Sequence, residues 1–137
     1  MARDVFHDLV KNALVRSGWT ITHDPLVIRW GRRDLFVDLG ASQLLAATQG
    51  TQKIAVEIKS FLNKSAVTDF YAALGQFGVY REIMAEQEKD RTLYLAMPSD
   101  IYTDLFEDDL GRLIIAHQQL KIILFTPETE EITRWIN

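Results

Sequence analysis

Apolar residues recur along the chain with two different spacings, one typical of helices and one typical of strands. They recur every three to four residues in 3–17, which ends at Ser17-Gly18, and again in 65–90. Both stretches are therefore predicted to be amphipathic helices, with Ser65 as the N-cap of the second.

Between these two stretches the chain is rich in β-branched and aromatic residues, which favour strands. Turn residues such as Asp24-Pro25 divide 19–40 into short segments, and 44–48 and 53–61 flank Gln49-Gly50-Thr51-Gln52. This pattern predicts three or four antiparallel strands, the last two joined by a tight hairpin at 49–52.

The last third of the chain alternates again between strand and helix patterns. The run RTLYLAMP, residues 91–98, indicates a buried strand, and a helical region follows from Ser99 to about Gln119, with a break near Gly111. The runs KIILFTP and EEITRWIN then predict two strands around a turn.

This order of elements predicts a single α/β domain, residues 1–137, with a mixed central sheet flanked by helices. The helix over 65–90 is long enough to be a crossover connection. The strand after it is therefore expected to run parallel to the strand before it.

The composition restricts the chemistry that this domain can perform. The chain has no cysteine, which excludes disulfides and thiolate metal sites, and carboxylate oxygens would favour Mg²⁺ or Mn²⁺. The net charge of −4 argues against a protein that coats nucleic acid through bulk electrostatics. Arg29, Arg32 and Arg33 are a local exception that fits either a positive patch beside an acidic site or a solvated mixed surface.

The sequence contains no recognisable signal peptide or membrane-spanning segment. No run of eighteen apolar residues occurs, and residues 1–10 lack a basic stretch followed by an apolar one. We therefore expect a cytoplasmic protein without a membrane span. No glycine-rich nucleotide-binding motif is present either.

The run KIAVEIKSF, residues 53–61, places a carboxylate beside an ammonium group. In a strand, Glu57 and Lys59 share one face, and the apolar residues occupy the other. The pair fits both a surface salt bridge and half of a metal-dependent active site.

Asp38, in LFVDLG, is a second acid in a strand-like run. A hairpin turn near Gly50-Thr51 would bring residues 42–44 opposite 57–59, so Asp38 is expected to reach Glu57 only if the chain bends, for example at Gly40. Asp34 is an alternative ligand in the same region, and Asp38 is preferred because it is nearer to the hairpin.

Two carboxylates and a lysine on adjacent strands suit metal-assisted hydrolysis of a phosphodiester. Asp38, Glu57 and the carbonyl of Ile58 would bind Mg²⁺ or Mn²⁺ through oxygen. The ion would lower the pKa of a bound water, and Lys59 would orient that water and stabilise the phosphate oxygens.

Three further side chains are candidates for the same site. Gln76 and Tyr80 are four residues apart on the long helix and so share a face; the alternative is a core tyrosine beside a structural glutamine. Gly75 and Gly78 are expected to let this helix approach the sheet closely. His7 on the first helix is the third candidate; the alternative is a partly buried structural histidine.

The Asp followed by Glu-x-Lys, with Gln-x-x-x-Tyr after it, resembles the PD-(D/E)xK nuclease superfamily and its RecB-like branch. That resemblance implies an αβββαβ core. It also implies the catalytic and metal-binding roles of Asp38, Glu57 and Lys59 given above. Related nucleases often carry a Glu or His on the first helix that faces the metal, which the resemblance assigns to His7, with Asp8 as a weaker alternative.

A narrower resemblance covers nearly the whole chain. The runs RDVFHDLVKNAL, GWTITHDPL, VDLGA, KIAVEIKSFL, ALGQFGVYR, RTLYLAMP and ITRWI are similar to the XisH family, known as fdxN element excision controlling factors. The resemblance implies a bacterial protein that acts with a partner called XisI and a separate site-specific recombinase in programmed excision of a DNA element. The family is expected to carry Ala-Ala-Glu where this chain reads Ala46-Ala47-Thr48.

Two functions follow as hypotheses. The first is a metal-dependent endonuclease that acts on DNA during excision. The alternative is a non-catalytic accessory protein that uses the fold as a scaffold for XisI or the recombinase, which the acidic pI near 5.3 and the small size favour. A nuclease of this size usually engages a duplex with a partner, so a homodimer is also expected.

Overall fold

The computed structural model of the chain describes residues 4–45, 50–62 and 65–137. Within these residues the helices are α1 (His7–Arg16), α2 (Ala66–Gln87), α3 (Ser99–Phe106) and α4 (Asp109–Gln118). The strands are β1 (Thr20–His23), β2 (Leu26–Trp30), β3 (Arg33–Val37), β4 (Leu39–Leu45), β5 (Gly50–Ile58), β6 (Arg91–Pro98), β7 (Ile122–Thr126) and β8 (Glu131–Ile136).

The main sheet of the described chain has six strands in the order β1-β4-β5-β6-β7-β8. β5, β6 and β7 run parallel, whereas β1, β4 and β5, and likewise β7 and β8, run antiparallel. The crossover through α2 therefore returns β6 parallel to β5, as predicted. The order α1-β1-β4-β5-α2-β6 gives the expected αβββαβ arrangement, with β2 and β3 inserted after β1.

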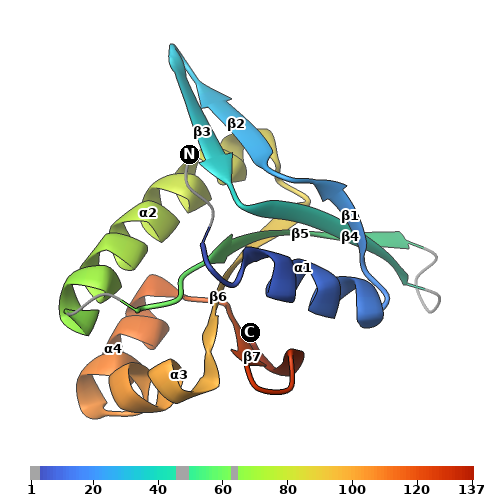
Figure 1. Cartoon of the computed structure of the whole chain (residues 1–137). Helices are drawn as coiled ribbons and strands as arrows, with labels where there is room; N and C mark the ends of the chain where they lie inside the picture. Colours follow the sequence, from blue (N-terminus) through green and yellow to red (C-terminus); the bar gives the residue numbers. More distant parts are fainter. Residues whose placement is uncertain (1–3, 46–49, 63–64) are drawn as a thin grey trace.

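Helices cover both faces of this sheet, and α1 and α2 lie on opposite sides of it (Figure 1). Alternate residues of each central strand point to opposite faces. On β6, Leu93 and Leu95 pack in the core beneath α2, α3 and α4, whereas Tyr94 and Ala96 pack in the core beneath α1. The mixed α/β sheet flanked by helices is thus confirmed. No helix in the described ranges is long and apolar enough to cross a membrane.

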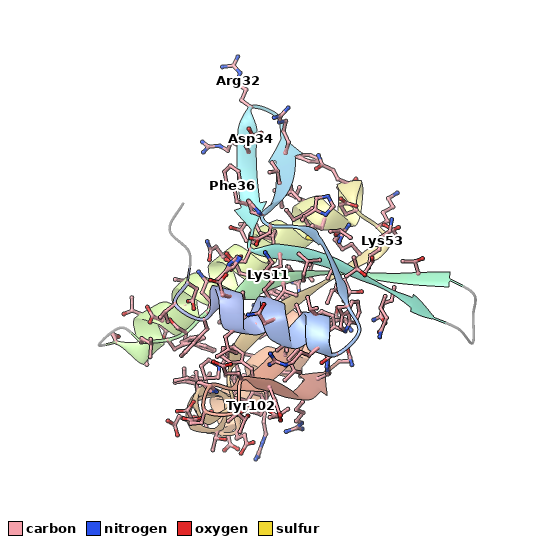
Figure 2. The ribbon with its side chains drawn as sticks, turned by 45° about the vertical axis from the view of Figure 1, so that its right-hand side comes forward. Lys11, Arg32, Asp34, Phe36, Lys53 and Tyr102 are labelled. Atoms are coloured by element: carbon pink, nitrogen blue, oxygen red, sulfur yellow. The ribbon has the colours of Figure 1, made fainter. Side chains whose placement is uncertain are left out.

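The strands β2 and β3 form a separate two-stranded sheet that projects from the body, here called the hairpin arm, residues 26–37 (Figures 1 and 2). Its inner face is anchored, because Leu26, Ile28 and Val37 are buried in the core that α2 covers. Its outer face stays exposed at Val27 and Phe36. The division of 19–40 into short strands was predicted, but their separation into a second sheet was not.

The hairpin between β4 and β5 turns earlier than the sequence suggested. Leu39 pairs with Val56 and Leu45 pairs with Gly50, so the segment 50–52 belongs to β5. The prediction of a turn at 49–52 is therefore wrong, because residues 50–52 pair with β4 as part of β5; residue 49 lies outside the described residues. The departure noted at Thr48 lies outside the described residues.

The ends of several helices were predicted closely. The Ser65 side chain accepts a hydrogen bond from the Thr68 N–H at 3.2 Å, which confirms the N-cap of α2. The first helix begins at His7 and not at residue 3. The break in the third helical region falls before Asp109, where the Asp108 side chain accepts from the Gly111 N–H at 2.8 Å.

The glycines of the helices play roles different from those expected. A Cβ at Gly75 or Gly78 would meet no heavy atom within 4 Å, so the expectation that they allow close approach to the sheet is wrong. At Gly111, in contrast, an added Cβ would lie 2.3 Å from the Cα of Phe106. Close backbone contact between α3 and α4 therefore requires glycine at 111.

Candidate functional site

Asp38, at the bend between β3 and β4, lies opposite Glu57 of β5. Because Leu39 pairs with Val56, the preceding Asp38 comes level with Glu57. The Asp38 N–H donates to Glu57 Oε1 at 3.3 Å, and the Ile58 N–H donates to Asp38 Oδ2 at 2.7 Å. The two carboxyl groups therefore meet without a bend at Gly40, and the expectation that such a bend is needed is wrong.

Burial changes the protonation of this carboxyl pair. Both residues are almost inaccessible, with Asp38 6% and Glu57 4% exposed as whole residues. Burial, and next the negative charge of Asp38, raises the pKa of Glu57 to about 8, although Lys59 opposes this shift. Burial also raises the pKa of Asp38, against the hydrogen bond from Ile58 and the charges of His7 and Lys59. The Glu57 carboxyl therefore holds its proton at neutral pH.

Lys59 follows the last residue of β5 and stays near the pair. Its Nζ is 3.7 Å from Glu57 Oε2, and its backbone N–H donates to the Ala96 carbonyl at 2.9 Å. Because the Glu57 side chain is only 6% exposed, the interaction is not a surface salt bridge. The ammonium group favours the ionised form of Glu57, but burial of the carboxyl group outweighs this effect on its pKa.

Tyr80 and Gln76 reach the site from α2. The Tyr80 hydroxyl donates to the Phe36 carbonyl at 3.2 Å and accepts from Gln76 Nε2 at 3.3 Å. Burial, with the charges of Glu57 and Asp38, raises the pKa of Tyr80 to about 12. Gln76 Oε1 is buried without a hydrogen-bond partner in the described structure. The shared helix face predicted for these two side chains thus lies against the carboxyl pair.

His7 is buried on α1, 3% exposed, and is oriented by Asp24. Its Nε2 lies 2.7 Å from Asp24 Oδ1, and since a carboxylate only accepts, Nε2 is the donor, which in the neutral ring leaves the lone pair on Nδ1. This Nδ1 is buried and has no hydrogen-bond partner among the described residues. Because His7 acts electrostatically on Asp38, it belongs to the surroundings of the carboxyl pair.

Asp24 and Lys11 belong to this cluster, and the sequence did not single them out. Lys11 Nζ donates to Asp24 Oδ2 at 2.7 Å. Burial would raise the pKa of Asp24, but the hydrogen bonds from Lys11 and His7 outweigh it and hold that pKa below its usual value. The sequence signal was the spacing of His7 and Lys11, four residues apart on one helix face.

Asp34 is not brought to the carboxyl pair. It lies on the hairpin arm, where it forms an exposed ion pair with Arg29. Asp34 is four positions before Asp38, and four steps of an extended chain span about 13 Å. Asp38 is therefore the carboxylate that faces Glu57.

A metal ion at this site would depend on few protein ligands. In the described segments, no three His, Asp or Glu side chains are grouped so that they could hold a metal ion. The carboxyl pair offers two oxygen ligands, and the main chain of Ile58 adjoins both. Such a set fits an ion that keeps several waters, as Mg²⁺ does.

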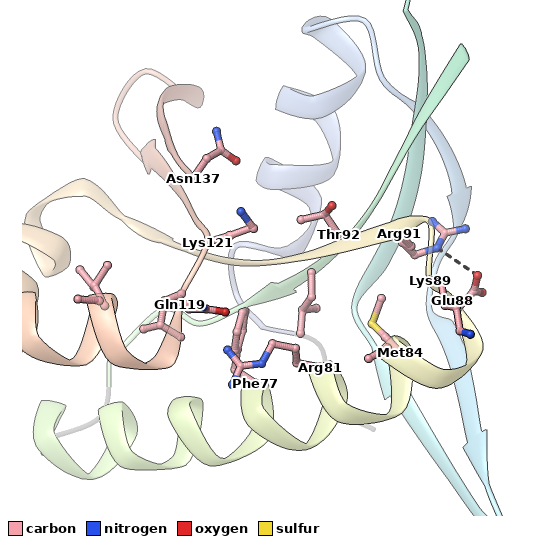
Figure 3. Close-up of a pocket in the computed structure, with 15 residues that line it drawn as sticks. Phe77, Arg81, Met84, Glu88, Lys89, Arg91, Thr92, Gln119, Lys121 and Asn137 are labelled. Atoms are coloured by element: carbon pink, nitrogen blue, oxygen red, sulfur yellow. Dashed lines mark ion pairs between the residues drawn. The ribbon is translucent and has the colours of Figure 1, made fainter.

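A separate cavity of about 710 Å³ lies between the C-terminal half of α2, the start of β6 and the end of α4 (Figure 3). Its lining includes Phe77, Arg81, Met84 and Lys121. It contains none of the candidate site residues, so the cavity and the carboxyl pair are distinct features.

The chain is similar to proteins of one family in two of three comparisons with known proteins. The family described as XisH protein matches residues 1–133. A crystal structure of an XisH family protein from Nostoc punctiforme PCC 73102 is 42% identical, with a TM-score of 0.88 over 98% of this chain and 100% of that one. A crystal structure of an fdxN element excision controlling factor protein from Anabaena variabilis is 46% identical, with the same TM-score and coverage. No curated protein matches the sequence.

Proposed function

The chain belongs to the XisH family, and from this membership and the buried carboxyl pair we propose that it controls excision of a DNA element through metal-dependent hydrolysis of a phosphodiester bond. The observation that carries the proposal is the meeting of Asp38 and Glu57 across β4 and β5, with Lys59 3.7 Å from Glu57. A buried pair of acids with a raised pKa is costly to the fold, and such pairs cluster at functional sites.

A divalent cation would relieve the cost of this pair. Mg²⁺ or Mn²⁺ would displace the proton held by Glu57 and bind to Asp38, Glu57 and the carbonyl of Ile58. When bound, the ion would supply an activated water and offset the negative charge that builds on the phosphate.

The surrounding side chains have separate tasks in this proposal. Lys59 stabilises the oxygens of the phosphate and orients the attacking water. His7, held by Asp24, presents a lone pair on Nδ1 that can accept a hydrogen bond or a proton from water. Tyr80 remains protonated at neutral pH and, with Gln76, positions the backbone of Phe36 next to Asp38.

The proposal is tested by metal binding and by nuclease assay. Calorimetry with Mn²⁺ should detect one site in the unmodified protein, an affinity at least about tenfold lower in Glu57→Gln, and no change in Asp34→Asn, which removes an acid away from the site. Cleavage of duplex, single-stranded and branched DNA in Mg²⁺ or Mn²⁺ should be lost in Glu57→Gln and in Lys59→Ala. An unmodified protein that neither binds the ion nor cuts any of these substrates overturns the enzymatic proposal.

The second candidate is the accessory scaffold, and the backbone hydrogen bonds of the carboxyl pair favour it. The bonds that Asp38 and Glu57 accept from the main chain join β5 to the junction of β3 and β4, which would preserve the fold without catalysis. Under this candidate, Glu57→Gln still captures an XisI-like protein or the recombinase in the presence of EDTA. If the unmodified protein captures neither partner, the scaffold function is excluded.

A further inference from the structure

We propose that the hairpin arm, residues 26–37, is a ribbon that inserts into a groove of duplex DNA and guides the duplex to the carboxyl pair. This inference rests on the proposed function, since it assigns the DNA-binding element of the same site. It goes beyond that function because it names the surface, the strand state of the DNA and the residues that contact phosphate.

The shape of the arm suits a DNA groove. β2 and β3 pair along their whole length, from Leu26 opposite Val37 to Trp30 opposite Arg33. Two strands lie about 4.8 Å apart, and a two-stranded ribbon fits the major groove of B-DNA, which is about 12 Å wide. Five residues in each strand extend about 17 Å, more than the groove depth of about 8.5 Å.

The charge of the arm contrasts with that of the chain. The arm contains three arginines and one aspartate, a net charge of +2, whereas the whole chain carries −4. Arg29 is engaged by Asp34. For Arg32 and Arg33, which are both exposed, no ion-pair partner is found in the described part of the chain. Two uncompensated guanidinium groups at the outer end of the arm are suited to contacting phosphates.

The arm also exposes apolar side chains that the protein itself does not cover. Val27 and Phe36 are paired across the outer face, with 48% and 37% exposed, and Trp30 near the turn is 53% exposed. Within a DNA groove, such side chains contact thymine methyl groups and sugars. Insertion into a groove would remove these apolar groups from water, while the arginines beside them would contact the phosphates.

The outer face of the arm leads directly to the carboxyl pair. Figure 2 shows Arg32 at the outer end, with Asp34 and Phe36 following toward the body. Phe36 is two residues before Asp38, which lies at the bend between β3 and β4, so the base of the outer face adjoins the carboxyl pair along the chain. The Tyr80 hydroxyl fixes the Phe36 carbonyl at 3.2 Å, which holds the base of the arm beside the site. A duplex on the outer face would therefore pass the proposed reaction centre.

The test compares two double variants that change the net charge equally. Arg32→Ala/Arg33→Ala removes the free cations of the arm, and Lys89→Ala/Arg112→Ala removes two exposed cations from α4 and from the segment after α2. Binding of a fluorescein-labelled duplex of about 30 base pairs is measured by anisotropy in EDTA, across about 50 to 200 mM KCl.

The arm variant is expected to bind at least about tenfold more weakly and to lower the slope of log K against log salt by about 2, whereas the control variant binds like the unmodified protein. Circular dichroism should show both variants folded. The inference is overturned if the unmodified protein does not bind duplex DNA or if the arm variant binds equally well. It is also overturned if the arm variant alters only self-association or capture of a protein partner.

These measurements distinguish DNA binding by the hairpin arm from hydrolysis at the carboxyl pair. Because binding is measured without divalent metal, weaker DNA binding by the arm variant supports the inference even if the unmodified protein cuts no DNA. Equal binding by both variants, together with metal-dependent cleavage that Glu57→Gln abolishes, refutes the arm and leaves the proposed function intact.

Discussion

Asp38 and Glu57 contact each other although they are nineteen positions apart in the chain. The backbone N–H of Asp38 donates to Glu57 Oε1 at 3.3 Å, and Asp38 Oδ2 accepts from the N–H that follows Glu57 at 2.7 Å. Two acids are thereby held together in the core, where only a proton or a cation can balance them. The stability of the folded protein should therefore depend on pH.

We expect the protein to lose stability as the pH rises in the presence of EDTA. The pKa of Glu57 is about 8 in the folded protein and near 4.5 as a model group, so between these values only the folded state retains the proton. The free energy of unfolding should therefore fall, on the order of 1 kcal/mol per pH unit, through this interval and level off above it. Asp38, whose pKa is also raised, acts in the same direction.

Urea unfolding at several pH values measures this dependence. Glu57→Gln should flatten the decline between about pH 5 and pH 8, whereas Glu86→Gln, at an exposed position on α2, should leave it unchanged. A decline of unchanged slope in Glu57→Gln would show that the proton resides on another group.

The hydroxyl of Tyr80 should contribute measurably to stability. Tyr80→Phe leaves the Phe36 carbonyl and the Gln76 amide without their shared partner, and the expected loss is about 1 to 2 kcal/mol of unfolding free energy. Tyr71→Phe is the matched control, because Tyr71 lies on the same helix and is 64% exposed. Equal denaturation midpoints for the two variants would contradict a structural role for the Tyr80 hydroxyl.

Glycine at 111 should be indispensable, whereas glycine at 75 should not. An added Cβ at Gly111 overlaps the backbone of Phe106, so Gly111→Ala should destabilise the protein by about 2 kcal/mol or more. Gly75→Ala meets no atom within 4 Å and should stabilise α2 by up to about 1 kcal/mol. Thermal unfolding of the two variants checks the opposite signs, and a shift in the same direction for both would refute the explanation.

His7 should be locked in one tautomer. With Asp24 accepting from Nε2, the neutral ring is protonated at Nε2 and unprotonated at Nδ1. Long-range proton–nitrogen NMR should detect this tautomer for His7, with exposed His117 as the internal reference. Asp24→Asn should shift the His7 nitrogen resonances and leave those of His117 in place. Identical His7 resonances in both proteins would exclude control by Asp24.

Local sequence patterns identified much of the fold and part of the site. The helix of 22 residues, its Ser65 cap and the parallel strand after it follow from spacing and capping alone. Gln76 and Tyr80 share a face because a helix completes a turn every 3.6 residues, about one turn between them. Glu57 was identified because it interrupts an apolar strand beside Lys59, which is also a local relationship.

The partners of the strands and their register could be determined only from the tertiary structure. Alternation with period two assigns faces to β4 and β5, but it does not locate the turn between them, and the turn was predicted about three residues too late. Only the observed register makes Asp38 meet Glu57.

The sequence by itself therefore determined the elements, their order and most of the polar residues of the site, because these depend on neighbours within one or two turns. Only the tertiary structure decided that Asp38 faces Glu57, that Asp24 orients His7 and that β2 and β3 leave the main sheet as an arm. These contacts join residues distant in the chain. Their selection depends on how all the apolar faces are buried together, which no local pattern encodes.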